Sequence, residues 1–378
     1  PIDAISIDRQ PCSHGVFCAA ETQGIRLSHE DSHIVPVEVD VQGRKGTLIG
    51  VFDGHGSDSV SKMAVKTIAN HCKQVFAKES DWKQVYLDAD EEIRGELADS
   101  DAGGSTAVTA IITGDMSGFQ ISVANLGDSR ALIIREDASF SVTEDHKPDA
   151  EEEEQRIRNA GGTVETMGGG PARLDGNLAL SRALGDFTYK SDKNLSPEKQ
   201  KCSIEPTVYE WTASPGDILF LACDGIFDVL SNEEVAQYVR KTFSSDPDFD
   251  PAEITRGIIR LALDRGTTDN LSAMVCLLGA DSKGPQEYMQ KELTAGKFNG
   301  QTDSQLADAY KNFIAKVGFR HLVCEVNGLP ALKACALCHR SFAEMQRCPE
   351  PCGVAYCSKN CQKIHWKMGH RQECKNKR

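Results

Sequence analysis

Residues 49–56 read "IGVFDGHG", where a strand-like run ends in an acid, a histidine and glycines. An apolar run ending at Phe52 leads into Asp53, and His55 follows between two glycines. A turn with a solvated imidazole is one interpretation, because glycine and aspartate are common in turns. The other is a metal and phosphate site, in which a carboxylate binds a hard cation. The remaining sequence has to distinguish the two.

Three further aspartates occur in the same kind of place, beside an apolar run and next to a glycine or an asparagine. They are Asp128 in "ANLGDSRA", Asp224 in "LFLACDGIFD" and Asp269 in "GTTDNLSAMV". Gathered carboxylates repel one another unless a cation is present, and Mg²⁺ and Mn²⁺ prefer oxygen ligands. Arg26 adds a planar donor group suited to phosphate. By spacing alone, a metal site and scattered turn acids remain equally open.

The part before residue 282 alternates short β-branched runs with helical segments. Several runs alternate apolar and polar residues, as half-buried strands do, and the turn "GDMSG" at 114–118 predicts a hairpin. Short connections favour antiparallel pairing and therefore an α+β fold. The four glutamates of 149–160 are interpreted as the first turn of a helix, where acids offset the helix dipole.

Nine motifs in chain order resemble the metal-dependent protein Ser/Thr phosphatases of type 2C. They are "QGIRLSHEDSH" (23–33), "VFDGHG" (51–56), "GGSTA" (103–107), "ANLGDSRAL" (124–132), "TEDHKP" (143–148), "RIRNAGG" (156–162), "LALSRALGDF" (178–187), "LACDGIFDVLSNEEV" (221–235) and "GTTDNLSAMV" (267–276). The one departure is Ser57, where the family usually has another glycine.

The resemblance implies a four-layer α-β-β-α sandwich of two antiparallel sheets flanked by helices. It also implies two Mg²⁺ or Mn²⁺ ions at one end of the sandwich, and a weaker third metal at Asp128. Asp53 would bridge the two ions and Gly54 would offer its carbonyl. The other implied metal residues are Asp224, Asp269, Glu30, Asp31 and Asp128.

The resemblance also implies the chemistry. A hydroxide bridging the two ions would attack phosphoserine or phosphothreonine, Arg26 would hold the phosphoryl oxygens, and His55 would protonate the leaving alkoxide. The motif "LALSRALGDF" is expected to be mostly structural, and a lysine-rich loop at about 187–204 is expected to shape substrate access.

Seven of the 14 cysteines fall between residues 335 and 374. With one histidine they make eight ligands, which is two tetrahedral zinc sites. The cluster resembles a MYND finger, whose interleaved ligands imply one zinc on Cys335, Cys338, Cys357 and Cys361, and another on Cys348, Cys352, His370 and Cys374. His365 competes with His370, which is preferred because it stands four residues before the last cysteine. Such fingers imply a protein partner, often a proline-containing peptide.

Composition limits the remaining possibilities. The chain has 378 residues and a formal net charge of −14, which makes nucleic-acid binding unlikely. No apolar run is long enough to span a bilayer. Scattered single cysteines fit a reducing compartment, cytoplasmic or nuclear. The chain opens at Pro1 without the apolar segment of a signal peptide, and residues could precede it.

We therefore predict a phosphatase domain over 1–282, a linker over 283–330 with an amphipathic helix near 303–317, and a zinc finger over 331–378. The predicted function is a protein serine/threonine phosphatase that the finger brings to its partners. The alternative is a catalytically silent phosphatase fold that acts as a scaffold through the finger. That alternative expects a lost metal acid, and every such acid is present.

Overall fold

The structure is a computed structural model that describes most of the chain. The described residues are 3–75, 81–97, 103–244, 249–280, 291–294, 304–326, 329–337, 340–342, 344–348 and 352–376.

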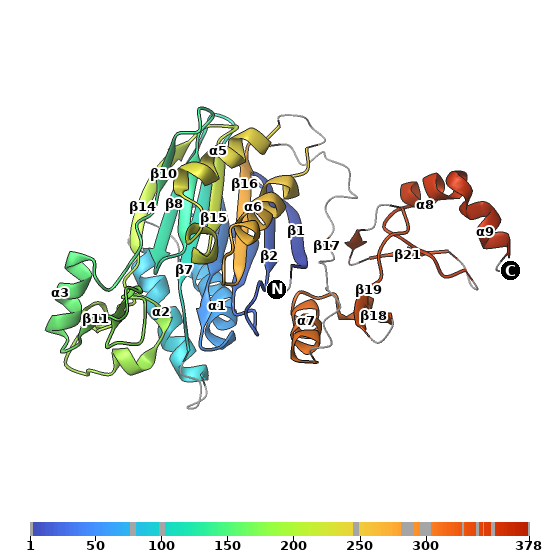
Figure 1. Ribbon diagram of the computed structural model, residues 1–378. Coiled ribbons are helices and arrows are strands. Elements are labelled where there is room, and N and C mark those ends of the chain that lie inside the picture. Colours follow the sequence, from blue (N-terminus) through green and yellow to red (C-terminus); the bar gives the residue numbers. More distant parts are fainter. Residues whose placement is uncertain are drawn as a thin grey trace.

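Two antiparallel sheets form the centre of the molecule (Figure 1). The five-stranded sheet runs in the order β14 (Thr207–Ala213), β8 (Gly118–Leu126), β7 (Ala107–Asp115), β4 (Arg44–Phe52) and β3 (Ser32–Val41). The eight-stranded sheet runs in the order β10 (Phe140–Val142), β9 (Arg130–Ile134), β15 (Ile218–Ala222), β16 (Leu271–Leu278), β2 (Gly15–Thr22), β1 (Ile5–Cys12), β17 (Glu292–Thr294) and β20 (Ser341–Phe342). The predicted hairpin is present, because β7 and β8 pair up to Asp115 and Gly118.

Helices cover the outer face of each sheet. The first pair is α1 (Ser59–Val75) and α2 (Asp81–Glu96), and the second is α5 (Asn232–Thr242) and α6 (Ala252–Asp264). One apolar cluster fills the space between the sheets, with Ile49 and Val51 facing residues such as Leu219 and Met274. Two more clusters join each sheet to its own helices. The four-layer α-β-β-α sandwich predicted from the sequence is therefore confirmed.

Smaller elements complete the chain. Around the sandwich are β5 (Gly54–His55), β6 (Gly104–Ser105), β13 (Leu184–Gly185), β11 (Val164–Thr166), β12 (Ala172–Leu174), α3 (Glu151–Asn159), α4 (Asp224–Phe227) and the 3-10 turns Phe187–Lys190 and Pro197–Lys199. Toward the C-terminus are α7 (Ser304–Lys316), the 3-10 turn Arg320–Leu322, β18 (Val323–Val326), β19 (Leu329–Leu332), β21 (Gln346–Arg347), β22 (Ala355–Tyr356), α8 (Lys359–His365), the π-helical turn Trp366–His370 and α9 (Arg371–Asn376). Among the described residues, every helix is too short or too polar to cross a bilayer.

The predicted acidic helix is α3, and its glutamates are structural. Glu153 is buried and pairs with Arg156 at 2.7 Å and with Arg182 at 2.6 Å, and it also accepts a hydrogen bond from Ser181. These partners outweigh the opposing effect of burial and lower the pKa of Glu153 to about 2. This side chain fastens α3 to the segment after it.

The eight-stranded sheet continues into the cysteine-rich region. β17 pairs with β1 on one side and with β20 on the other. Glu292 on β17 is fully buried and pairs with Arg9 at 2.7 Å, with Arg256 at 3.4 Å, and with Arg340. Although burial alone would raise it, these arginines lower the pKa of Glu292 to about 2. Main-chain pairing and this carboxylate together join the two parts of the chain.

The loop over 187–204, expected to shape substrate access, contributes no residue to the wall of the acidic cleft described below, whereas residues 171–180 contribute to it. Lys190 is not a solvated loop lysine. It is 8% exposed and pairs with Asp90 of α2 at 2.9 Å. A buried ion pair thus ties the start of this loop to the helical layer.

This ion pair gives a stability prediction. Lys190→Met leaves the buried Asp90 carboxylate without its cation, and breaking such a pair costs about 3–5 kcal/mol. We expect the free energy of unfolding to fall by that amount in urea titrations. Lys193→Met, an exposed lysine in the same segment, is the matched control and should change it by less than about 0.5 kcal/mol. Equal stability of the two variants would contradict this assignment.

Candidate active site

A polar cleft of about 480 Å³ brings together residues that lie far apart in the sequence. Nearly all of the residues predicted for the metal and phosphate site line it, namely Arg26, Glu30, Asp53, Gly54, His55, Asp128, Asp224 and Asp269. Asp31 does not line the cleft but lies buried behind it. Sequence reasoning did not single out Lys147, Arg173 and Asp228, which also contribute to the wall.

The "DGHG" stretch continues as a strand and is not a turn. β5, which is Gly54 and His55, pairs with β6 in a small three-stranded sheet at the edge of the cleft. A side chain cannot replace the hydrogen of Gly54, because a Cβ there would lie 2.5 Å from the main-chain oxygen of Glu30. The glycine thus lets two main-chain segments of the site approach each other closely.

The acids of the cleft are held in an unfavourable electrostatic state. Burial, followed by the charge of Asp224, raises the pKa of Asp53 well above its ordinary value. Burial, followed by the charge of Asp128, raises the pKa of Asp224 in the same way. The carboxyls oppose one another's ionisation, so the site favours either protons or cations.

These residues fit a site for divalent cations. Asp31 and Asp224 each have one buried carboxylate oxygen that accepts no hydrogen bond from the described residues. The other oxygen of Asp31 accepts a hydrogen bond from Ser272 at 2.7 Å. Such orphaned oxygens are costly unless a ligand satisfies them, and an oxygen-only donor set is what Mg²⁺ and Mn²⁺ prefer.

His55 is oriented by a partner that the sequence did not reveal. Its Nε2 lies 2.7 Å from Oδ2 of Asp186, the aspartate of "LALSRALGDF". Burial works to lower the pKa of His55, but the hydrogen bond and charge of Asp186 prevail and raise it. Gly104 makes room for the pair, because a Cβ there would lie 2.2 Å from Asp186 and 2.6 Å from His55. Asp186 also has a left-handed backbone conformation, with φ of 50°, which marks it as an unusual residue and which the sequence alone does not reveal.

Two basic side chains, those of Arg26 and Lys147, border the acids of the cleft. Arg26 is 56% exposed at its side chain and donates to Asp269 at 2.6 Å and to the carbonyl of Thr268 at 3.1 Å. Lys147 pairs with Asp128 at 2.5 Å. Both side chains therefore have carboxylate partners of their own, and Arg26 is the more exposed of the two.

The cysteine-rich region forms two groups of metal-binding side chains. Cys348, Cys352, His370 and Cys374 are all buried, with ligand atoms within 4.8 Å of one another. The sulfurs of Cys348 and Cys374 are 3.6 Å apart, close to the roughly 3.8 Å edge of a tetrahedron with Zn–S bonds of about 2.3 Å.

The second group consists of Cys335, Cys357 and Cys361, and Cys338 lies outside the described residues. Of the two competing histidines, His370 joins the first group, whereas Nδ1 of His365 lies 2.9 Å from the hydroxyl of Tyr356. For the seven expected ligands that the structure describes, the fold brings together the interleaved groups expected from the sequence.

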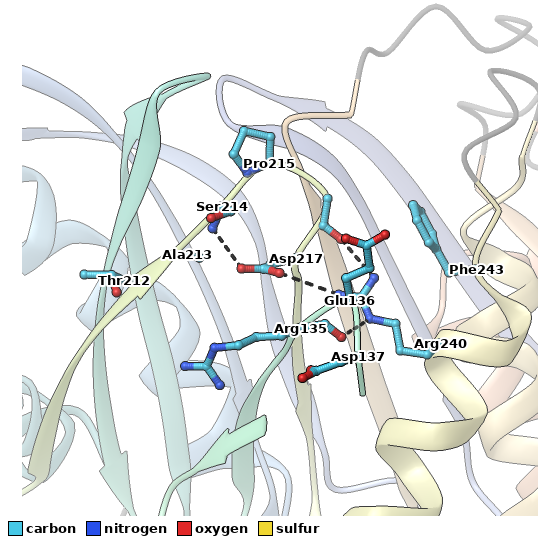
Figure 2. Close-up of a pocket in the computed structure, with 11 residues that line it drawn as sticks. Arg135, Glu136, Asp137, Thr212, Ala213, Ser214, Pro215, Asp217, Arg240 and Phe243 are labelled. Carbon is cyan, nitrogen blue, oxygen red and sulfur yellow. Dashed lines mark hydrogen bonds and ion pairs between the residues drawn. The ribbon is translucent and has the colours of Figure 1, made fainter. Parts of the chain in front are cut away.

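A larger hollow of about 920 Å³ lies elsewhere, around Arg135, Ser214 and Arg240 (Figure 2). Arg240 donates to the carbonyls of Ile134 at 2.5 Å and Gly216 at 2.9 Å, and also to that of Arg135. The same guanidinium lies 3.7 Å from the carboxylate of Asp217 and 5.8 Å from the ring centroid of Phe243. Because main-chain carbonyls engage this guanidinium, we assign it the structural role of joining α5 to the strand ends.

Comparison with known proteins agrees with this geometry. The family model "Protein phosphatase 2C" matches residues 16–271, and the model "MYND finger" matches residues 335–374. A probable protein phosphatase 2C 71 of Arabidopsis thaliana is 36% identical over 261 residues, which are 68% of this chain and 54% of that protein. Protein phosphatase 1A of Bos taurus is 31% identical over 314 residues, 78% of this chain and 77% of that protein.

Solved structures show the same fold. A phosphatase from a pathogenic strain of Toxoplasma gondii superposes with a TM-score of 0.66 at 25% identity and covers 78% of this chain and 99% of its own. A sex determining protein of C. elegans superposes with a TM-score of 0.59 at 26% identity, over 74% of this chain and 68% of its own.

The sandwich and its acid-lined cleft define a phosphatase of the metal-dependent class. The chain belongs to the protein phosphatase 2C family, and a MYND finger follows its phosphatase fold.

The pair of His55 and Asp186 gives a prediction about protonation. Asp186→Asn keeps the size of the side chain but removes the charge that holds the proton on His55. We expect the pKa of His55 to fall, because burial then acts unopposed by Asp186, and NMR titration of the imidazole measures it. Asp149→Asn, at an exposed aspartate before α3, should leave it unchanged. An unaltered pKa in Asp186→Asn would rule out this role for Asp186.

Proposed function

We propose that the protein is a metal-dependent protein serine/threonine phosphatase, which a partner bound to its finger directs to substrates. The observation that carries the proposal is the cleft that gathers Asp53, Asp224 and Asp269 beside His55 and Arg26. Asp53 would bridge two cations and the Gly54 carbonyl would assist it. The remaining cation ligands would be Glu30, Asp31, Asp128, Asp224 and Asp269. Nothing favours the silent scaffold, because the acid set is complete.

Mg²⁺ or Mn²⁺ held by these acids supplies activation of water and neutralisation of phosphoryl charge. The chain's own residues do the rest. Arg26 at the mouth is placed to orient the phosphoryl oxygens through the donors that it does not share with Asp269. Asp186 at Nε2 raises the pKa of His55 and so favours its protonated form, in which Nδ1 would give a proton to the departing serine or threonine oxygen.

A cysteine nucleophile does not fit this site. Cys223 adjoins the cleft in sequence, but it is fully buried, and burial together with the charge of Asp31 raises its pKa well above the ordinary value. A thiol that stays protonated is a poor nucleophile. Hydrolysis by water, with no phosphoenzyme, is the chemistry that the side chains support.

Hydrolysis of a phosphothreonine peptide with added Mn²⁺ tests the proposal. We expect release of phosphate that requires Mn²⁺, and a loss of at least about 100-fold in kcat/KM for Asp53→Asn, since that change removes central charge from the site. Asp149→Asn is the control and should retain full activity. A metal-loaded wild-type protein without turnover, or an active Asp53→Asn, would refute it.

We propose that the finger is held by two structural Zn²⁺ ions and binds a protein partner, with a proline-containing peptide as the expected ligand. The four buried side chains around Cys348 support a closed zinc site, which offers no open position for catalysis. Within the described part of the chain, the single cysteines of the sandwich form no disulfide, and all of them except Cys12 are buried, which fits a protein of the cytoplasm or the nucleus.

Paired cysteine substitutions test the finger. Cys348→Ser should lower the zinc content from two ions to one per chain and abolish capture of peptides from a proline-rich array. Cys324→Ser on β18, away from both ligand groups, should keep both properties. The number of zinc ions per chain is measured by elemental mass spectrometry. Peptide capture that survives the loss of zinc would contradict the proposed binding surface.

A further inference from the structure

Helix α7 lies in a part of the chain that neither family model matches, between residues 271 and 335. Figure 1 shows it between the sandwich and the finger. Its apolar face is buried, through Tyr310, Phe313 and Ile314, which agrees with the predicted amphipathic helix. A packing role alone would not require the polar contacts that its last residue makes.

That last residue, Lys316, reaches the back of the acidic cleft. Its Nζ donates to the main-chain carbonyl of Asp31 at 2.9 Å and to that of His29. It also lies 3.3 Å from Oδ2 of Asp58, ahead of α1. Three acceptors account for the three N–H groups of a lysine, and the side chain is only 19% exposed. These three acceptors therefore hold the Lys316 ammonium group in one position.

A ring contact holds the same segment one turn earlier along α7. The imidazole of His29 and the ring of Phe313 meet edge to face, with centroids 5.3 Å apart and planes at 83°. On its other side, Nε2 of His29 lies 3.1 Å from the carboxylate of Glu21. The histidine is thus fixed between β2 and α7.

The two carbonyls that Lys316 binds flank Glu30, whose own main chain is also held. The Glu30 N–H donates to Asn270 at 2.8 Å, and its carbonyl accepts a hydrogen bond from Ser61 at 2.5 Å. Three separate elements, α1, the loop before β16 and α7, therefore fix residues 29–31. Of these, only α7 lies outside the stretch that matches the phosphatase family model.

We propose that Lys316 is a positioning residue for Glu30 and Asp31, and that α7 is an integral part of the cation site. Carboxylates bind a cation tightly only if their main chain is already in place, and partners behind the ligands typically contribute 10–100-fold in metal affinity. This inference rests on the proposed function, because it takes Glu30 and Asp31 to act at the cations.

Lys316→Met in the zinc-loaded full-length protein tests the inference, because methionine keeps the aliphatic length and loses the charge and the donors. Calorimetric titration with Mn²⁺ should show affinity about 10-fold weaker than wild type. At saturating Mn²⁺, kcat should stay within about twofold. Lys316→Arg, which restores charge and donors, should recover most of the affinity.

The matched control is Lys66→Met, at an exposed lysine on α1, which should bind Mn²⁺ as the wild type does. Zinc content and circular dichroism establish that each variant is folded. Wild-type Mn²⁺ affinity in a folded Lys316→Met would overturn the inference, even if the protein is an active phosphatase. Failure of the proposed function looks different, since the wild type would then bind Mn²⁺ and hydrolyse no phosphopeptide.

Discussion

Mutual repulsion among buried carboxylates is the constraint on which this molecule depends. Burial raises the pKa of both Asp53 and Asp224, and the neighbouring charges of Asp224 and of Asp128, respectively, add to the effect. Bringing such charges together destabilises the folded protein unless a ligand offsets their repulsion, and bound divalent cations do so. The sandwich provides the necessary stiffness, because the acids stand at the ends of strands whose other residues are packed between two sheets. The active site is therefore a group of mutually repelling carboxylates held at the edge of a rigid core.

The same rigidity extends beyond the family fold. β17 and β20 lengthen the eight-stranded sheet into the finger, and Glu292 gathers three arginines where they meet. Further along, α7 binds the main chain behind the cation ligands. Both β17 and α7 therefore make direct contacts with the sandwich, although neither lies in the stretch that matches the phosphatase family model.

Much of the fold and of the site could be predicted from the sequence, because the residue types and motif spacings that indicate them are local features. Acids after apolar runs, the order of nine motifs and the cysteine spacing predicted the sandwich, the contents of the cleft and the grouping of His370 with three cysteines. The errors have one origin. In the sequence, Lys190 looks like a surface lysine and Asp186 like a structural acid. The residues that they contact, Asp90 and His55, lie 100 and 131 positions away along the chain, so local patterns do not show these pairs.

By itself, the sequence determined the residue types and the order in which they occur: which side chains can bind cations, which can bind zinc, and which runs become strands. Only the tertiary structure decided how those groups are held. The pairing of His55 with Asp186, the engagement of Arg26 by Asp269 and the grip of Lys316 on residues 29–31 all depend on contacts between segments far apart in the chain. Periodicity and motif spacing describe a chain along its length, whereas hydrogen bonds and charge interactions depend on distances in space.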